Sequence, residues 1–199
     1  MSNYYESFYG YTGLFPILKA DKIKVSHTIE LREILSTLPN DGGSLFSRTG
    51  LVHGARLFIL DDVVYNGHPT SVEHLEYEYL AVSLTFDGEL EDIANKLAEL
   101  GGDEFKSIFM HCYGFSEIDM SASSILQFLK LGQVTTSFLY VEADGNLQET
   151  LRALLAQKLI ADMLEKAQFL NVADKKNLIL TTAAKISAAK LPLAGDFIQ

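Results

Sequence analysis

The alternation of apolar and polar residues between positions 49 and 114 predicts the centre of the fold. Residues 51–64 have the pattern of a strand that is apolar on both faces in its middle. Residues 76–86 predict a return strand, and Asn66-Gly67 between them is typical of a turn. The apolar face of the return strand carries Leu80, Val82, Leu84 and Phe86.

Two helices and two further strands surround this pair. A 3.6-residue apolar period predicts a helix that Ser26 or Thr28 caps and that ends before Pro39. The same period predicts a second helix that Asp87 caps and that ends at Gly101-Gly102. Alternating stretches predict strands at 12–18 and 105–112.

The order strand, helix, strand, strand, helix, strand over residues 12–114 is that of a ferredoxin-like α+β fold. Its helices cover one face of an antiparallel sheet and leave the other bare. Because the strand at 51–64 is apolar on both faces, we expect the bare face to be covered as well, since exposed apolar area costs about 25 cal/mol per Å². The carboxy-terminal elements, a second subunit, or both could cover it, and a homodimer is the preferred prediction.

The pattern changes in the second half of the chain. Residues 121–131 predict a helix, 134–142 a strand, and the sequence from Asp144 a long helix. A weaker helix from about 173 to 190 and a loose tail follow. We therefore divide the chain into a ferredoxin-like unit with an amino-terminal aromatic arm, residues 1–115, and a helix–strand–helix half, residues 116–199, which we expect to pack on the same sheet.

The charge excludes some classes of partner. The formal net charge is -10, from 26 acidic and 16 basic residues, so the surface repels nucleic-acid backbones and anionic lipid. No apolar run reaches the ~20 residues that a membrane span needs. The first residues lack the pattern of a secretory signal, and the single cysteine, Cys112, cannot form an internal disulfide. These features predict a cytoplasmic protein with no nucleic-acid or membrane partner.

Three segments carry a resemblance to a known superfamily. The stretches from His53 to Asp62, from Leu84 to Gly88 and from Met110 to Phe115 resemble the ferredoxin-like units of the dimeric α/β-barrel superfamily. That group includes dye-decolorizing peroxidases, chlorite dismutases and small ligand-binding or monooxygenase domains. The resemblance covers roughly residues 12–165. It implies an α/β-barrel-like assembly in which two sheets face each other, often around a ligand cavity.

The resemblance also makes haem a possible cofactor, but the residues argue against transferring the haem chemistry. Dye-decolorizing peroxidases carry a Gly-x-x-Asp-Gly segment, and the Asp-Gly pairs at 41, 87 and 144 lack the earlier glycine. The haem enzymes take their proximal histidine from the second half of the chain, whereas no histidine follows His111 here.

Six residues form the predicted pocket on the open sheet face. They are His53, Arg56, Tyr77, Tyr79, Phe109 and His111. Arg56 could bind an anion through its guanidinium, or form a salt bridge to Asp61, Asp87 or a glutamate of a partner. His53 and His111, on strands predicted to be adjacent, could act as acid/base groups or haem ligands, or could each be structural. A single bulge reverses the face to which a strand residue points.

Two other features have structural interpretations. His111 and Cys112 are strand neighbours that point to opposite faces, so the imidazole does not activate the thiol, and Cys112 is predicted to lie in the core. His68, Glu73, His74, Glu76 and Glu78 cluster at the hairpin loop, but their spacing matches no established ligand pattern. We predict no metal site there.

Three functions are compatible with these observations. The first is a cytoplasmic small-molecule-binding protein of the α/β-barrel kind, with catalytic residues unknown. The second is a haem-dependent or cofactor-free, peroxidase-like oxidoreductase of the same superfamily. The third is an accessory module whose bare sheet docks another protein.

Overall fold

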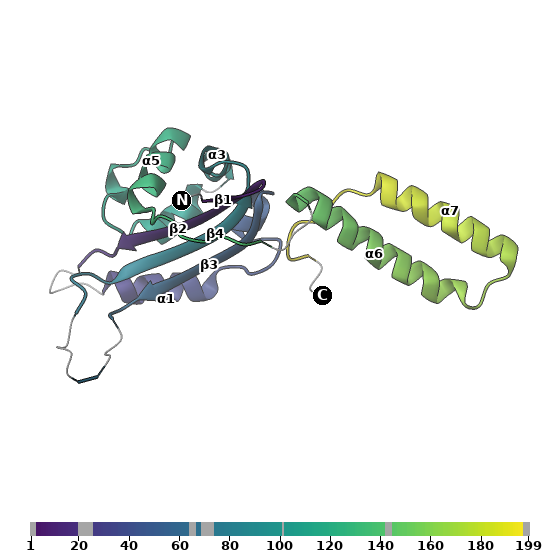
Figure 1. The fold of residues 1–199 in the computed structure, drawn as a ribbon, viewed down its shortest axis with the longest axis horizontal. Coiled ribbons are helices and arrows are strands. Elements are labelled where there is room, and N and C mark those ends of the chain that lie inside the picture. Colours follow the sequence, from purple (N-terminus) through teal and green to yellow (C-terminus); the bar gives the residue numbers. More distant parts are fainter. Residues whose placement is uncertain are drawn as a thin grey trace.

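The fold is α+β, built on a four-stranded antiparallel sheet with the strand order β1-β2-β4-β3 (Figure 1). The computed structural model describes residues 3–19, 26–63, 67–68, 74–100, 102–141 and 145–196. The strands are β1 (Tyr4–Tyr5), β2 (Phe8–Pro16), β3 (Val52–Leu60) and β4 (Tyr79–Asp87). The helices are α1 (His27–Thr37), α2 (Leu45–Arg48), α3 (Leu90–Leu100), α4 (Gly102–Phe109), α5 (Ala122–Gly132), α6 (Leu147–Ala167) and α7 (Val172–Ala188), with a 3₁₀ turn at Phe115–Glu117. This arrangement is consistent with the predicted ferredoxin-like α+β fold.

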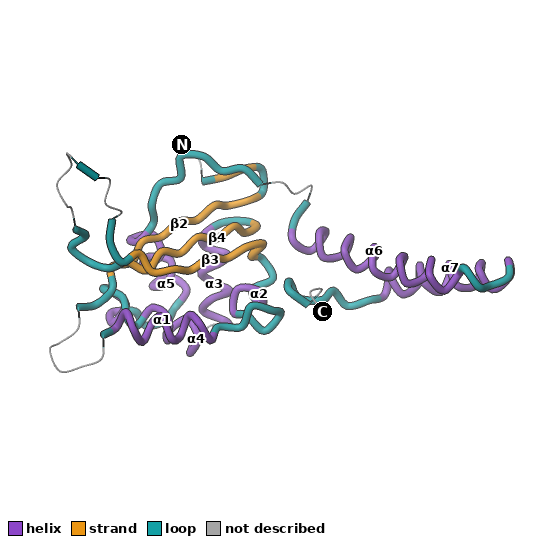
Figure 2. The backbone as a smooth tube through the Cα atoms, turned by 90° about the horizontal axis from the view of Figure 1, so that it is seen from below, coloured by secondary structure: helices purple, strands orange, loops and turns teal. Residues whose placement is uncertain are grey.

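Helices α1 to α5 all lie on one face of the sheet (Figure 2). The pairing of β2 with β4 sets the core face, because Tyr9 lies opposite Phe86 and Phe15 opposite Leu80. The strand residues of the core pack against apolar helix residues that include Ile93, Leu97, Phe105, Ile108, Phe109, Ile125 and Phe128. The aromatic rings of Phe15 and Phe128 stack with their centroids 4.8 Å apart. The core is therefore a two-layer sandwich of helices on sheet.

The predicted strand at 105–112 is wrong. Residues 102–109 form helix α4, which buries Phe105, Ile108 and Phe109 at the i, i+3, i+4 spacing of a helix. A short apolar run satisfies both periods, and contact with the helix layer decides between them. The sheet position beside β2 is taken by β1, whose Tyr4 pairs with Tyr9.

The predicted strand at 134–142 is an extended segment without a ladder over its described part. Gln133 forms an isolated bridge with Gly13, and the Val134 N–H donates to the Thr12 carbonyl over 2.8 Å. The segment then stays beside β2, where the Thr136 hydroxyl donates to the Gly10 carbonyl at 3.4 Å and Leu139 packs where a β-carbon on Gly10 would lie. Residue 142 lies outside the described residues.

The last two helices form an antiparallel hairpin that extends beyond the end of the sheet (Figure 1). Of residues 116–199, α5 therefore packs against β2, while α6 and α7 do not cover the open face. Hydrogen bonds connect both ends of the hairpin to the rest of the protein. The start of α6 bonds to Asp87, and the tail after α7 returns to α2, where the Ser47 hydroxyl donates to the Ala194 carbonyl over 2.6 Å.

Candidate functional site

The six predicted pocket residues do not share one pocket. Residue 53 lies at the start of β3, while Tyr79 pairs with Leu60 at its other end, a separation of about 23 Å at 3.3 Å per residue. Tyr77 lies near the Tyr79 end, with its ring against Tyr113. Phe109 belongs to helix α4 and is buried in the hydrophobic core. His53 and His111 are therefore not neighbours, and His111 does not lie on a strand.

Arg56 lies exposed on the open face, opposite Ser83 of β4. Its guanidinium carbon sits 4.9 Å from the centre of the Phe58 ring, a cation–π contact. The two predicted partners within the chain are engaged elsewhere, since Asp61 pairs with Arg32 and Asp87 pairs with His53. A salt bridge to a second subunit stays a prediction.

A β-bulge turns His53 toward the open face. The register of β3 shifts between Val52 and Gly54, so His53 has no partner residue on β4. Its Nε2 lies 2.8 Å from a carboxylate oxygen of Asp87, and its ring contacts Phe8 edge to face. Both side chains of the pair are 15% exposed. The bulge thus decides which face carries the imidazole.

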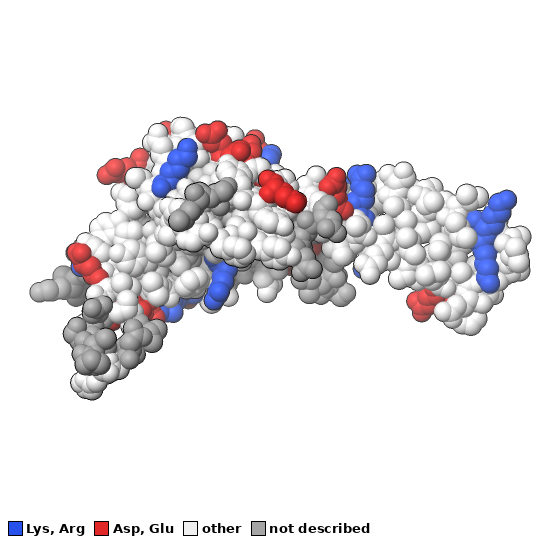
Figure 3. Space-filling view, in the orientation of Figure 1, with Lys and Arg blue, Asp and Glu red and all other residues white. Residues whose placement is uncertain are grey.

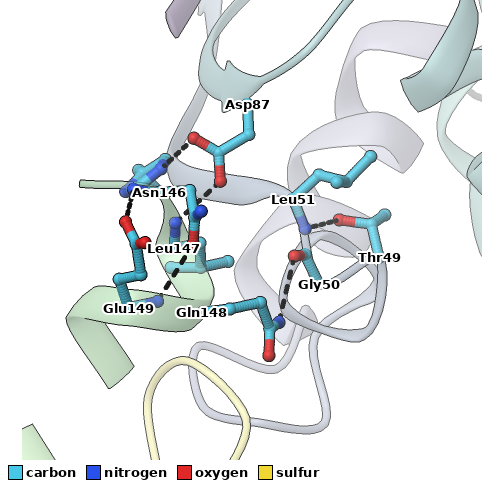
Figure 4. Close-up of polar contacts among 9 residues, drawn as sticks. Thr49, Gly50, Leu51, Asp87, Asn146, Leu147, Gln148 and Glu149 are labelled. Carbon is cyan, nitrogen blue, oxygen red and sulfur yellow. Dashed lines mark hydrogen bonds and ion pairs between the residues drawn. The ribbon is translucent and has the colours of Figure 1, made fainter. Parts of the chain in front are cut away.

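Asp87 joins the sheet to helix α6 rather than capping α3 as predicted. Its second oxygen accepts the Leu147 N–H at 2.7 Å (Figure 4). Asn146 and Glu149 complete a capping box at the same helix start. At α3 it is Asp92 that accepts the Glu89 N–H. The carboxylate of Asp87 therefore lies at the positive end of the α6 dipole.

A cleft of about 380 Å³ lies along the outer edge of β3. Apolar walls come from α1, α2, β3 and α4, and the tail at Ala194–Gly195 closes one side. The apolar lining includes Leu35, Leu38, Phe46, Val52, Leu57 and Ile108, and the polar members are Asn40, Asp41, Ser44, Ser47, His53 and Glu104. Of the six predicted pocket residues, His53 is the one that contributes to this lining. The Nε2 of His53 is already hydrogen-bonded to Asp87.

A second polar centre lies at the opposite end of the sheet and was not predicted. His27 and Glu30, in the first turns of α1, meet His111 in the turn after α4. The Nδ1 atoms of the two histidines are 3.0 Å apart, and the Nδ1 of His111 is 3.7 Å from a carboxylate oxygen of Glu30. The i, i+3 spacing of His27 and Glu30 was visible in the sequence, but their approach to His111 was not.

Burial shifts the pKa values of His111 and Cys112. Desolvation is the main cause that lowers the pKa of His111, and the neighbouring His27 lowers it further. Burial raises the pKa of the Cys112 thiol to about 12, so this thiol stays protonated and is a core residue. Cys112 is thus unsuited to nucleophilic chemistry.

Two members of the cluster predicted at the β3–β4 loop, His74 and Glu78, have separate partners. His74 bonds to Asp62, and this contact is the main cause that lowers the pKa of Asp62 to about 2. Glu78 accepts a hydrogen bond from Thr28. Glu73 lies outside the described residues.

Comparisons with protein-family models, with curated proteins and with solved structures find no match to this chain. None of the described helices combines the length and apolar composition needed to cross a bilayer.

Proposed function

We propose that the protein binds a small, mostly apolar molecule in the cleft beside β3. The cleft volume of about 380 Å³ carries this proposal, because ligand pockets of about 300–1,000 Å³ with apolar walls and few polar groups are typical small-molecule sites. The outer edge of β3 adds backbone groups, since β3 ends the strand order of the described sheet. The site also lies where the returning tail closes one wall.

The polar residues of the cleft indicate the charge of the ligand. Asp41 and Glu104 are both acidic, and Glu104 is paired with Arg48. An anionic ligand is disfavoured by these carboxylates and by the net charge of -10. The expected ligand is uncharged and carries one hydroxyl or amide that bonds to Ser44 or to the β3 backbone.

A fragment screen with a matched pair of variants tests this proposal. Uncharged aromatic and alicyclic fragments bearing one hydroxyl or amide are screened by saturation-transfer NMR. Ala55 lines the cleft and is exposed, whereas its neighbour Arg56 is not part of the lining. We expect Ala55→Trp to fill the cleft and remove binding, and Arg56→Ala to retain it. Loss on Arg56→Ala with retention on Ala55→Trp would instead place the ligand on the open sheet face.

A second candidate function, self-association, is supported by the surface of the α6–α7 hairpin. Ile160 and Leu164 lie one turn apart on α6 and are exposed, as are Val172, Ile179 and Leu180 on α7. Across both helices, the face seen in Figure 3 carries few charged side chains. The hairpin residues 147–188 hold six basic and four acidic residues. The hairpin therefore carries a small net positive charge, whereas the rest of the chain is strongly acidic. Two hairpins repel each other less than two copies of the acidic remainder would.

The dimensions of the hairpin suit a dimer. Helix α7, with 17 residues, is about 25 Å long, and two helices side by side are about 20 Å wide. Two such faces bury roughly 1,000 Å² in total, the lower bound for a specific interface. We therefore propose a homodimer in which two hairpins form a four-helix bundle.

Sedimentation equilibrium tests the homodimer. We expect the wild type to be dimeric and the variants Ile160→Glu and Ile179→Glu to be folded monomers. The control Lys176→Glu, on α7 like Ile179, should remain dimeric. A monomeric wild type at high micromolar concentration contradicts the proposal. If both glutamate variants stay dimeric, the interface does not lie on the hairpin. The open sheet face would then be the candidate interface, as in the assembly of α/β-barrel proteins.

The haem-dependent or cofactor-free oxidoreductase of the α/β-barrel kind stays a prediction from the sequence, as does a cytoplasmic location. An absorbance spectrum after haem addition and desalting tests the haem form. A retained Soret band that His53→Ala or His111→Ala removes would support it, and a featureless spectrum would exclude haem binding under those conditions.

A further inference from the structure

Three side chains that come from two distant parts of the sequence surround one point near the start of α1. They are His27, Glu30 and His111, and one ligand atom from each lies within 4.8 Å of the others. We propose that these residues bind a single divalent transition-metal ion, with zinc as the reference ion. The site is separate from the cleft, because none of the three residues lines it.

The distances suit ligands of one ion. Two ligand atoms at 2.0–2.1 Å from a tetrahedral zinc ion lie about 3.3–3.4 Å apart. The two Nδ1 atoms are 3.0 Å apart, and the His111 Nδ1 lies 3.7 Å from Glu30. Both separations differ from the expected value by only a few tenths of an ångström. The His27 and Glu30 ligand atoms lie within 4.8 Å of each other, so side-chain rotations are needed to bring all three groups to coordination distance.

The backbone holds the ligands in place without the ion. Ser26 caps α1 through the Thr28 N–H, which fixes the first turn that carries His27 and Glu30. The carbonyl of His111 accepts the Leu18 N–H at 2.8 Å, and α1 contacts α4. Pre-positioned ligands reduce the ordering cost of binding.

The histidine pair is incompletely satisfied as it stands. Two facing Nδ1 atoms at 3.0 Å allow one hydrogen bond, in which one imidazole donates and the other accepts. In either tautomer the buried Nε2 of His111 has no hydrogen-bond partner among the described residues. An ion between the rings would accept both Nδ1 lone pairs.

The types of the three side chains indicate which metal ions would bind and whether the site is structural or reactive. Two imidazoles and one carboxylate, without a thiolate, suit zinc or ferrous iron rather than calcium or magnesium. Three protein ligands leave a position for water, as in zinc sites that react rather than in purely structural ones. His111 is buried, whereas the side chain of Glu30 is 47% exposed. The open position therefore faces solvent on the Glu30 side.

The test uses the full-length, untagged chain, stripped with a chelator and titrated with zinc chloride in a calorimeter. We expect one zinc per chain, visible d–d absorption bands when cobalt replaces zinc, and a higher melting temperature with either ion. Glu30→Gln and His27→Gln change partly exposed residues and should keep the fold. Removing a residue that only hydrogen-bonds to a metal ligand typically weakens metal binding by about 10- to 100-fold. Because His27 and Glu30 would contact the ion directly, each variant should weaken zinc binding by about 100-fold or more. Each should also abolish the cobalt bands.

The control is His74→Gln, which changes a histidine bonded to Asp62. It should keep the stoichiometry, the affinity and the cobalt spectrum. Circular dichroism of each variant separates loss of ligands from loss of fold. The proposal is overturned if the folded wild type binds no zinc, or if Glu30→Gln and His27→Gln both bind zinc as the wild type does. In that case the three residues form a hydrogen-bonded structural cluster.

Discussion

Replacing Asp87 with alanine should destabilise the protein more than any change to an exposed carboxylate. One oxygen of Asp87 bonds to His53 at 2.8 Å and the other accepts the Leu147 N–H at 2.7 Å. The variant leaves a 15% exposed imidazole and the first N–H of α6 without an acceptor. Hydrogen bonds to a charged group contribute about 1.5–3 kcal/mol each.

Because some water reaches the site, we expect the lower part of that range, about 3–4 kcal/mol of unfolding free energy for both bonds together. Asp87→Asn keeps a carbonyl oxygen for Leu147 but loses the charge at the helix start. Its expected cost is about 1 kcal/mol. Asp162→Ala, at an exposed position in the interior of α6, serves as control and should change stability by no more than about 0.5 kcal/mol.

Urea unfolding followed by circular dichroism and tyrosine fluorescence measures these values, since the chain has no tryptophan. Hydrogen exchange at Leu147 reports whether the start of α6 loosens. An unfolding free energy of Asp87→Ala within about 0.5 kcal/mol of the wild type, with unchanged exchange at Leu147, would contradict a stabilising role of the two hydrogen bonds. Loss of stability without faster exchange there would assign the effect to His53 alone.

Three further predictions concern the core. Gly132→Ala should cost about 1–3 kcal/mol in a thermal melt, because the added methyl overlaps the buried ring of Phe15; a change under about 0.5 kcal/mol would contradict this packing. Tyr11→Phe should cost about 1–2 kcal/mol, because the hydroxyl of the buried Tyr11 donates to the Leu129 carbonyl at 2.9 Å; an unchanged urea midpoint would count against that bond. Cys112 should resist a thiol reagent at neutral pH until the protein unfolds, because its thiol is buried and its pKa is raised to about 12; rapid labelling of the native protein would show that the site opens.

The local elements with strong signals could be predicted from the sequence. Helix α3 carries a clear 3.6-residue period, and Ser26, Ser121 and Asn146 accept a backbone hydrogen bond at the start of α1, α5 and α6. These features depend on residues within one or two turns of each other. For the same reason α7 was predicted within two residues at each end, although little of it is buried.

The sites depended on contacts between distant segments. Neither the bulge that turns His53 toward Asp87 nor the pairing of Asp87 with α6 leaves a periodic signal, because both join residues more than thirty positions apart. The run at 105–112 fitted a strand or a helix until the helix layer buried Phe105 and Phe109 together.

The sequence by itself therefore determined the α+β class, the boundaries of helices α1, α3, α5 and α7 to within two or three residues, and the net negative charge, since these follow from local periodicity and composition. Only the tertiary structure separated His53 from His111 and brought His111 to His27 across 84 positions. Side-chain chemistry at a site depends on angles and distances that the chain acquires by packing. A one-dimensional pattern cannot carry that information when a single bulge, or one strand that becomes a helix, changes which groups meet.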